Sequence, residues 1–561
     1  MSVHELLIFV LAAGAVIVVV RWIANRTGLP AAALLPLIGI GYALLPGPNV
    51  SLDPDIILTF VLPPLLYSAA LDSSLLGIRR NLRTVVSLSV FLVLLTALLI
   101  GFGFAWFVAG ATLAAGVAVG AAVAPPDPVA ALAVGRRAGL PPRLVTLIQG
   151  EGLLNDATAL TILSVAVAAA VDGDFSAPAA LGQFVIAAVG GVAVGVTVAF
   201  VVRLLSRPVS SDPLLANTVS LGVPFVAYLI GEQLHVSGVL AVVVAGLVVG
   251  HHRPQSASGA GRLQTSAVWR LVDFLLEGFV FLLIGQQLPA VVRGLASYDT
   301  STVVVAVSIT VGVVLLLRPL WLLLTQSLPR SLHTWLGSGR FDLGSGRFDK
   351  DDDTEPDDGA PLTGREVVAL SWSGTRGVIS LAAIFTLPLV TESGEPFPDR
   401  DLLLFCTYVV VFVTLVGQGL TFAPIVRALG LRANDNDKAR LRNEARSASV
   451  EAALVALDDL QEQNHDDIHV HVIDTMRGQL RTRLGRYQRR VALLRTSDPD
   501  SPPVSATYEA ALHVRRVALD AQREELLRWR DTGRLPDEGL RTLERELDHE
   551  ELLLPDRPAQ R

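Results

Sequence analysis

About thirteen apolar stretches of membrane-spanning length occupy the first three quarters of this chain. A bilayer core offers no water to backbone N–H and C=O groups, so such stretches must fold as helices that satisfy these groups internally. The composition agrees, because 51% of the residues are hydrophobic and only 17% are charged. The chain is therefore predicted to be an all-α polytopic membrane protein, with spans at 6–20, 30–45, 56–71, 85–108, 111–134, 145–171, 181–205, 214–230, 236–249, 268–288, 303–324, 367–390 and 402–429.

The loops between these segments alternate in positive charge. Of the arginines between these segments, almost all lie in the loops after the odd-numbered segments, whereas the alternate loops carry only Arg293 and Arg400. Positive loops remain in the cytoplasm, which predicts an N-terminus outside and a C-terminal tail inside. The alternation requires the short ninth segment to cross, although its length also fits a re-entrant piece. The first segment has no basic stretch before it and is interpreted as a retained helix.

Two regions are polar. Residues 327–364 contain a repeated Leu-Gly-Ser-Gly-Arg-Phe-Asp unit followed by acids, which predicts a flexible cytoplasmic loop within a transmembrane domain at 1–430. Residues 434–561 are charged and helix-rich, which predicts a cytoplasmic helical tail with a regulatory or dimerising role. Calcium binding by the acidic loop is a less favoured alternative. So is metal binding by the tail cluster of His465, Asp466, Asp467, His469 and His471.

The fifth segment is interrupted by Pro125, Pro126, Asp127 and Pro128. Three prolines remove three amide donors and disfavour helical backbone before them, so we expect two half-helices here. Asp127 would then stand at the N-cap of the second half, facing its unpaired amides and the positive end of its dipole. Broken backbone at membrane depth is tolerated only in a protein-lined or water-filled site. A simple proline kink is the alternative.

The twelfth segment contains a second interruption at Gly374, Thr375, Arg376 and Gly377. Interrupted helices at corresponding positions of two halves indicate the binding site of an inverted-repeat transporter. Segments 1–6 and 8–13 would form the two repeats, with segment 7 as the connector. The fold is thus predicted to contain two discontinuous helices.

The sixth segment supplies the carboxylates expected to do the chemistry. Glu151 is predicted to form a buried, structural ion pair with Arg376, whose permanent charge needs a partner. Asp156 lies about 140° away from Glu151 around the helix, above Gly152, where we expect space for an ion. Without an assigned cation partner, Asp156 would let a proton and a metal cation compete for one carboxylate.

Competition for a single site is sufficient for exchange. If the empty, charged site reorients between the two sides of the membrane less readily than the neutralised site, each inward proton is exchanged for an outward cation. Oxygen ligands from Asp156, Asp127, carbonyls near Pro126 and water suit a hard monovalent cation. Asn155 adds no charge, so one proton per cation is the simplest stoichiometry. The alternative for Asp156 is a hydrogen-bonded structural acid.

Together these motifs resemble those of the sodium/proton exchanger family of monovalent cation:proton antiporters, over roughly residues 1–430. The motifs are Leu62-Pro63-Pro64-Leu65-Leu66, Asp127-Pro128-Val129-Ala130, Glu151-Gly152-Leu153-Leu154-Asn155-Asp156, Glu232 with His235, Ser237 and Gly238, and Arg376-Gly377. The resemblance implies a homodimer and electroneutral exchange of sodium or lithium for protons, with Asp156 as the carrier. It further implies Asn155 as the neighbour of the carrier, Asp127 as the acid of the unwound crossing, and Glu151 with Arg376 as the ion pair.

This chain departs from some prokaryotic members of that family at Ser68 and Gly152, where those members have a carboxylate and a hydroxyl. Selectivity among sodium, lithium and potassium therefore stays open. Accessory roles are considered for Ser68, for Glu277 in the tenth segment, and for Glu232 and His235 beside an external loop. The predicted partners are the cation, the proton, the bilayer of the plasma membrane and a second copy of the chain; no cofactor, resident metal or nucleic acid is predicted.

Rival functions come from other classes. An intramembrane aspartyl protease would also need two membrane acids, but it would set one of them in a Gly-x-Gly-Asp context that this chain lacks. A passive channel needs no titrating carrier, and a solute-sensing receptor would place a signalling motif in the tail. The nearest alternative is a potassium/proton antiporter with the same machinery. The favoured function is sodium/proton exchange for pH and sodium homeostasis.

Overall fold

The computed structural model forms two compact units, Met1–Arg432 and Ala433–Arg561. All regular elements in its described part are helices. The predicted acidic loop at 327–364 lies almost entirely outside this part, as do His465 and Asp466. The described residues are 3–27, 31–44, 56–128, 131–132, 135, 139–172, 177–209, 212–256, 259–327, 362–391, 397–431, 435–463, 467–496, 506–532, 534–535 and 537–551.

The first unit has the membrane character that the sequence predicts. Seven segments in its described part are long and apolar enough to cross a bilayer, and four shorter apolar helices accompany them. The long segments are Leu7–Thr27, Leu82–Phe107, Pro142–Val171, Leu181–Leu205, Pro213–Gln233, Thr300–Thr325 and Arg400–Ala428. An all-helical, multi-pass membrane protein is confirmed, while thirteen crossings and inverted repeats stay predictions.

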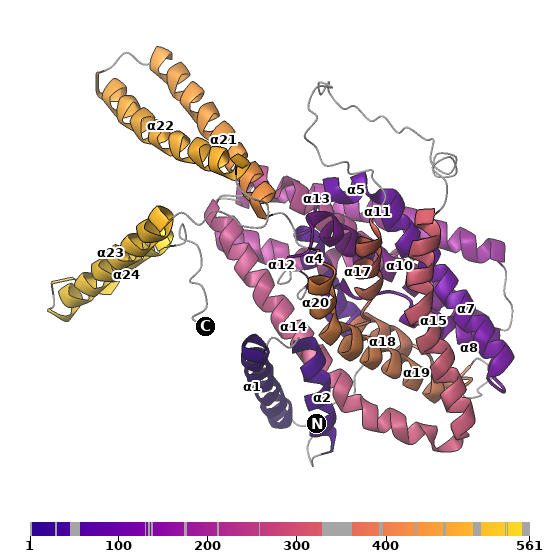
Figure 1. The fold of residues 1–561 in the computed structure, drawn as a ribbon. Coiled ribbons are helices and arrows are strands. Elements are labelled where there is room, and N and C mark those ends of the chain that lie inside the picture. The colour runs from indigo at the N-terminus through magenta and orange to yellow at the C-terminus, as the bar shows by residue number, and fades with distance from the viewer. Residues whose placement is uncertain are drawn as a thin grey trace. The chain divides into compact units, whose positions relative to one another are not determined.

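The contacts between helices divide the first unit into two sets, whose members are labelled in Figure 1. We call one set the crossing bundle, because it contains both interrupted segments. Its helices are α5 (Leu75–Arg80), α6 (Leu82–Val86), α7 (Leu92–Phe107), α8 (Leu113–Val123), α10 (Pro142–Asp172), α15 (Thr300–Ser327), α17 (Gly364–Trp372), α18 (Val378–Phe385), α19 (Arg400–Phe412) and α20 (Gly419–Ala428).

The other set is the second bundle. Its helices are α1 (Val3–Thr27), α2 (Ala31–Ala43), α4 (Leu62–Leu71), α11 (Ala177–Val209), α12 (Pro213–Gln233), α13 (Gly238–Ser256) and α14 (Gly259–Gly294). The bundles meet where α14 contacts α18 and α19, and where α10 contacts α4 and α13. Small residues allow close helix packing, as where Gly39 of α2 faces the backbone of α14 at Gly285.

Both predicted helix interruptions are present. Helix α8 ends at Val123 and helical backbone resumes at Pro128, while α17 ends at Trp372 and α18 begins at Val378. Proline chemistry explains the first gap. The outer ends of the half-helices are capped locally, because the Thr112 hydroxyl accepts from the Ala115 amide at 3.1 Å and Thr363 forms a capping box with Glu366.

Three π-helical turns widen the apolar helices among the described residues, and such turns often mark functional positions. They are η1 (Ile57–Val61), η2 (Ser87–Phe91) and η4 (Val413–Gln418). A short 3₁₀ turn, η3 (Leu295–Ser297), follows α14. In η4 the Thr414 hydroxyl accepts a 3.0 Å hydrogen bond from the Arg376 amide, so this turn supports the second interruption.

The described residues of the second unit form two helical hairpins. Helix α21 (Asp435–Gln463) packs on α22 (Asp467–Thr496), and α23 (Ala506–Asp531) packs on α24 (Asp537–Glu551). Ion pairs such as Arg495 with Glu444 and Arg523 with Asp548 lie on exposed faces, where each contributes little. Within the described residues no group of histidines, cysteines and acids is arranged to hold a metal ion.

Candidate functional site

The two interruptions contact each other directly. We call this place the crossing; it comprises residues 124–127 and 373–377. The Asp127 amide donates to the Thr375 carbonyl at 2.6 Å, and the Thr375 hydroxyl donates to the Asp127 carbonyl at 2.9 Å. Each interruption thereby supplies partners for backbone groups that the other leaves without a helical bond, as buried broken backbone requires.

Arg376 occupies the C-terminal end of α8. Its guanidinium donates to the carbonyls of Val123 at 3.0 Å and Ala124 at 3.3 Å, and also to the carbonyl of Gly374. The last carbonyls of a helix lack intrahelical donors and carry the negative end of its dipole. A buried cation at this position therefore satisfies the interrupted helix.

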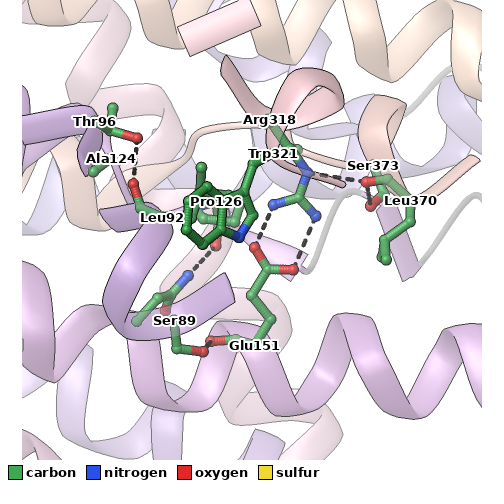
Figure 2. Close-up of polar contacts among 12 residues, drawn as sticks. Ser89, Leu92, Thr96, Ala124, Pro126, Glu151, Arg318, Trp321, Leu370 and Ser373 are labelled. Atoms are coloured by element: carbon green, nitrogen blue, oxygen red, sulfur yellow. Dashed lines mark hydrogen bonds and ion pairs between the residues drawn. The ribbon is translucent and has the colours of Figure 1, made fainter. Parts of the chain in front are cut away.

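Glu151 is paired with Arg318 of α15, so the predicted pair of Glu151 with Arg376 is wrong. Figure 2 shows the Arg318 guanidinium facing the Glu151 carboxylate in two parallel hydrogen bonds, one of them 2.9 Å between Nη2 and Oε2. Both side chains are almost completely buried, at 3% and 1% exposure. The physical reason is that the Arg376 donors are already used by carbonyls, whereas Arg318 reaches Glu151 from a separate helix.

Arg318 also completes the second interruption. Its Nε donates to the Leu370 carbonyl at 3.0 Å, near the C-terminal end of α17, where the Ser373 hydroxyl donates to the same carbonyl at 2.8 Å. The C-terminal carbonyls of each interrupted helix thus accept hydrogen bonds from an arginine, Arg376 for α8 and Arg318 for α17. Sequence reasoning missed Arg318, although an arginine inside the apolar segment at 303–324 is itself a signal of function.

Two glycines allow the elements to approach at the crossing. A β-carbon on Gly377 would overlap the Asp127 carboxylate, so that carboxylate lies against the N-cap position of α18. A β-carbon on Gly152 would lie 2.6 Å from Cδ of Pro128. The predicted ion space above Gly152 is therefore wrong, because the proline ring fills it and packs α10 against the crossing.

Asn155 and Asp156 lie beside the crossing on α10, with exposures of 0% and 2%. The Asn155 amide donates to the Pro126 carbonyl at 2.9 Å, while its Oδ1 atom is buried and has no hydrogen-bond partner among the described residues. In the same part of the chain, no hydrogen bond or ion pair holds the Asp156 carboxylate, and Asp127 is near enough to repel it. These oxygens suit a small hard cation or a proton.

The accessory residues fall in two places. Glu232 lies exposed in the last turn of α12 and accepts from the Gly238 amide, and His235 lies on the exposed turn between α12 and α13. Ser68 of α4 is buried and donates to Oδ2 of Asp273 in α14 at 2.5 Å. Glu277, one turn further along α14, lies within electrostatic range of Asp127. Sequence reasoning missed Asp273, which is an acid within the apolar segment at 268–288.

The chain is similar in sequence and fold to known proteins. The family model described as sodium/hydrogen exchanger, transmembrane, matches residues 14–428. The chain is 31% identical to an uncharacterized Na+/H+ exchanger of Mycobacterium tuberculosis (strain H37Rv), over 98% of this chain and 96% of that protein. It is 27% identical to a sodium, potassium, lithium and rubidium/H+ antiporter of Bacillus subtilis, over 96% of this chain and 76% of that protein. A solved structure, the sodium proton antiporter MjNhaP1 of Methanocaldococcus jannaschii, shares the fold with a TM-score of 0.58 at 19% identity, over 76% of this chain and 99% of that chain.

Proposed function

This chain belongs to the sodium/hydrogen exchanger family, and from that membership and the crossing we propose that it exchanges sodium or lithium ions for protons across the plasma membrane. It is a multi-pass secondary transporter and not an enzyme. The proposed exchange is electroneutral, with one proton traded for one cation in an alternating-access cycle. Its role would be pH and sodium homeostasis.

The observation that carries the proposal is the difference in bonding between the two acids of α10. Glu151 is held by Arg318, whereas no described residue donates to the Asp156 carboxylate. A bare carboxylate in a buried place costs free energy, and either a proton or a bound cation removes that cost. Asp156 is therefore the proposed carrier, and its two occupants exclude each other.

The neighbours of Asp156 would complete the cation site. Asn155 offers its buried Oδ1 atom, because the bond from its amide to Pro126 fixes the orientation of the side chain. Asp127 adds a second carboxylate at the crossing. The Glu151–Arg318 pair and Arg376 would serve as structural charges that hold the interrupted helices.

The wider organisation is proposed on the same basis. Segments 1–6 and 8–13 would form two inverted repeats within a transmembrane domain at 1–430, and the protein would be a homodimer. The charge pattern of the loops supports an external N-terminus and a cytoplasmic C-terminus. The tail at 434–561 would be regulatory or dimerising.

Potassium/proton exchange by the same residues is the second candidate. It is favoured by the name of the Bacillus subtilis relative, a sodium, potassium, lithium and rubidium/H+ antiporter. The same carboxylate would serve both cations, so the two functions differ only in ligand spacing around Asp156.

The test uses everted membrane vesicles with a preset pH gradient and graded additions of sodium, lithium and potassium. Wild-type protein is expected to relieve the gradient with sodium or lithium, and Asp156→Asn is expected to abolish relief because a neutral amide cannot exchange a proton for a cation. Asp299→Asn, at an exposed position outside the crossing, is the matched control and should exchange normally. Equal size-exclusion profiles would show that folding is intact. Normal exchange by Asp156→Asn would refute the mechanism.

A further inference from the structure

Helix α14 carries a row of four side chains with polar groups. Thr265, Trp269, Asp273 and Glu277 follow one another at four-residue spacing. Residues four apart on a helix lie on neighbouring turns of one face, with a drift of about 40° per step. The row therefore winds slowly around α14 as it runs from the Arg262 end toward the middle of the helix.

The hydrogen-bond partners change along the row as this drift requires. The Thr265 hydroxyl donates to Oδ1 of Asn217 at 2.6 Å, and the Trp269 indole donates to the Ser220 hydroxyl at 3.0 Å, both on α12. At Asp273 the partner is Ser68 on α4. The row thus passes from α12 to α4, and ring contact of Tyr67 with Trp269 at 5.3 Å fixes α4 against it.

Asp273 is only half satisfied. The Ser68 hydroxyl holds its Oδ2 atom, but its Oδ1 atom is buried and has no hydrogen-bond partner in the described part of the chain. A buried carboxylate oxygen without a donor costs free energy. This oxygen therefore has the capacity to accept a further ligand, and a cation is one that also offsets the charge.

Glu277, at the far end of the row, is close enough to the crossing to interact with its charges. Glu277 lies within electrostatic range of Asp273, Asp127 and Arg21. Twelve residues separate Thr265 from Glu277, which is about 18 Å along a helix and more than half of a hydrocarbon core of about 30 Å. A row of this length can connect one side of the membrane with its middle.

We propose that Asp273, oriented by Ser68, and Glu277 form the approach path by which the transported cation reaches Asp127 and Asp156 from the Arg262 end of α14. This rests on the proposed cation/proton exchange and adds residues from the second bundle to it. A series of carboxylates attracts cations and raises their local concentration at the carrier. Hydroxyl and carboxylate oxygens are also the ligands that hard monovalent cations prefer.

The experiment compares half-saturating sodium concentrations in everted and right-side-out vesicles. The Arg262 end is predicted to be cytoplasmic, so sodium added to everted vesicles meets it first. Asp273→Asn is expected to raise the half-saturating sodium concentration about tenfold in everted vesicles, with the maximal rate within about twofold. From the opposite side the change should be less than about twofold, a sidedness that a merely structural role would not produce.

Two further variants make the test specific. Ser68→Ala should give a smaller rise of the same sidedness, and it should have no added effect in the Asp273→Asn background, since both changes act through one carboxylate. Asp299→Asn makes the same chemical change at an exposed acid and should leave the constant unaltered.

Several outcomes would overturn the inference. An unchanged constant in Asp273→Asn, or an equal change from both sides, would show that Asp273 is not on the path. If Asp273→Asn does not fold, an unchanged constant in Ser68→Ala decides against the proposal. Absence of any cation-driven signal in the wild type would instead refute the proposed function, so the two failures are distinguishable.

Discussion

Separating Glu151 from Arg318 should destabilise the crossing bundle strongly. Both side chains are almost fully buried and share two hydrogen bonds. Glu151→Gln leaves the guanidinium buried without its counter-charge, at a cost of about 3–5 kcal/mol. Arg318→Met leaves the Glu151 carboxylate buried without its counter-charge, at a similar cost. It also removes one of the two donors to the Leu370 carbonyl, which adds about 1 kcal/mol.

The double variant should be less damaged than Arg318→Met alone. With both charges gone no uncompensated ion remains, so the coupling between the two changes should reach about 3 kcal/mol. Arg376 offers the matched comparison, because its donors go to the carbonyls of Val123 and Ala124. Coupling of Glu151→Gln with Arg376→Met should therefore stay below about 1 kcal/mol.

The assay is the free energy of unfolding of the purified protein in detergent, measured by denaturant titration of the three single and two double variants together with the wild type. Thermal midpoints from size-exclusion after heating give an independent ranking. If Glu151→Gln couples as strongly to Arg376→Met as to Arg318→Met, the assignment of Arg318 as the partner is refuted.

Two other perturbations follow from the geometry. Gly377→Ala should cost about 1–3 kcal/mol of stability and impair exchange, because its β-carbon would overlap the Asp127 carboxylate. Gly417→Ala is the control and should do neither, because there is open space around Gly417. Equal thermal midpoints and exchange rates for the two variants would contradict this packing. Asp399 is the N-cap residue of α19, and partial burial raises the pKa of its carboxyl against an opposing hydrogen bond from the Tyr298 hydroxyl. Ionisation of this carboxyl therefore lowers the stability of the fold as pH rises from the ordinary pKa of 3.8 through the raised pKa. Asp399→Asn should then be more stable than the wild type at pH 7, with the difference vanishing below pH 3.8; a difference that grew as pH fell in thermal melts would reverse the sign of this argument.

Local chemistry made part of this site predictable from the sequence. The gap at Pro125 and Pro126 follows from missing amide donors, and the gap at Gly374 and Gly377 from residues that weaken a helix, so both interruptions are where the sequence predicts them. The charges of the fifth, sixth and twelfth segments are equally visible in the sequence, whereas sequence reasoning missed Arg318 and Asp273. Their significance followed from the cost of burying an ion, whatever the tertiary structure.

The partners of those charges could not be predicted. Glu151 and Arg318 are 167 residues apart, and no local pattern tells which of two arginines reaches a given acid. The choice depends on where the carbonyls of α8 end, since these occupy Arg376. Likewise, the space above Gly152 looked open from the helical spacing, but a ring from another element fills it.

The reciprocal bonds between Asp127 and Thr375 have a mechanical consequence. Sliding one interrupted helix past the other would break both bonds at once and leave buried amide, hydroxyl and carbonyl groups without partners. The free-energy cost of this keeps the two interruptions joined. Any displacement of one interrupted segment therefore moves the other with it. The oxygens next to Asp156 would then move as one rigid group. Their ligand geometry would stay the same while their exposure to water changes from one side to the other.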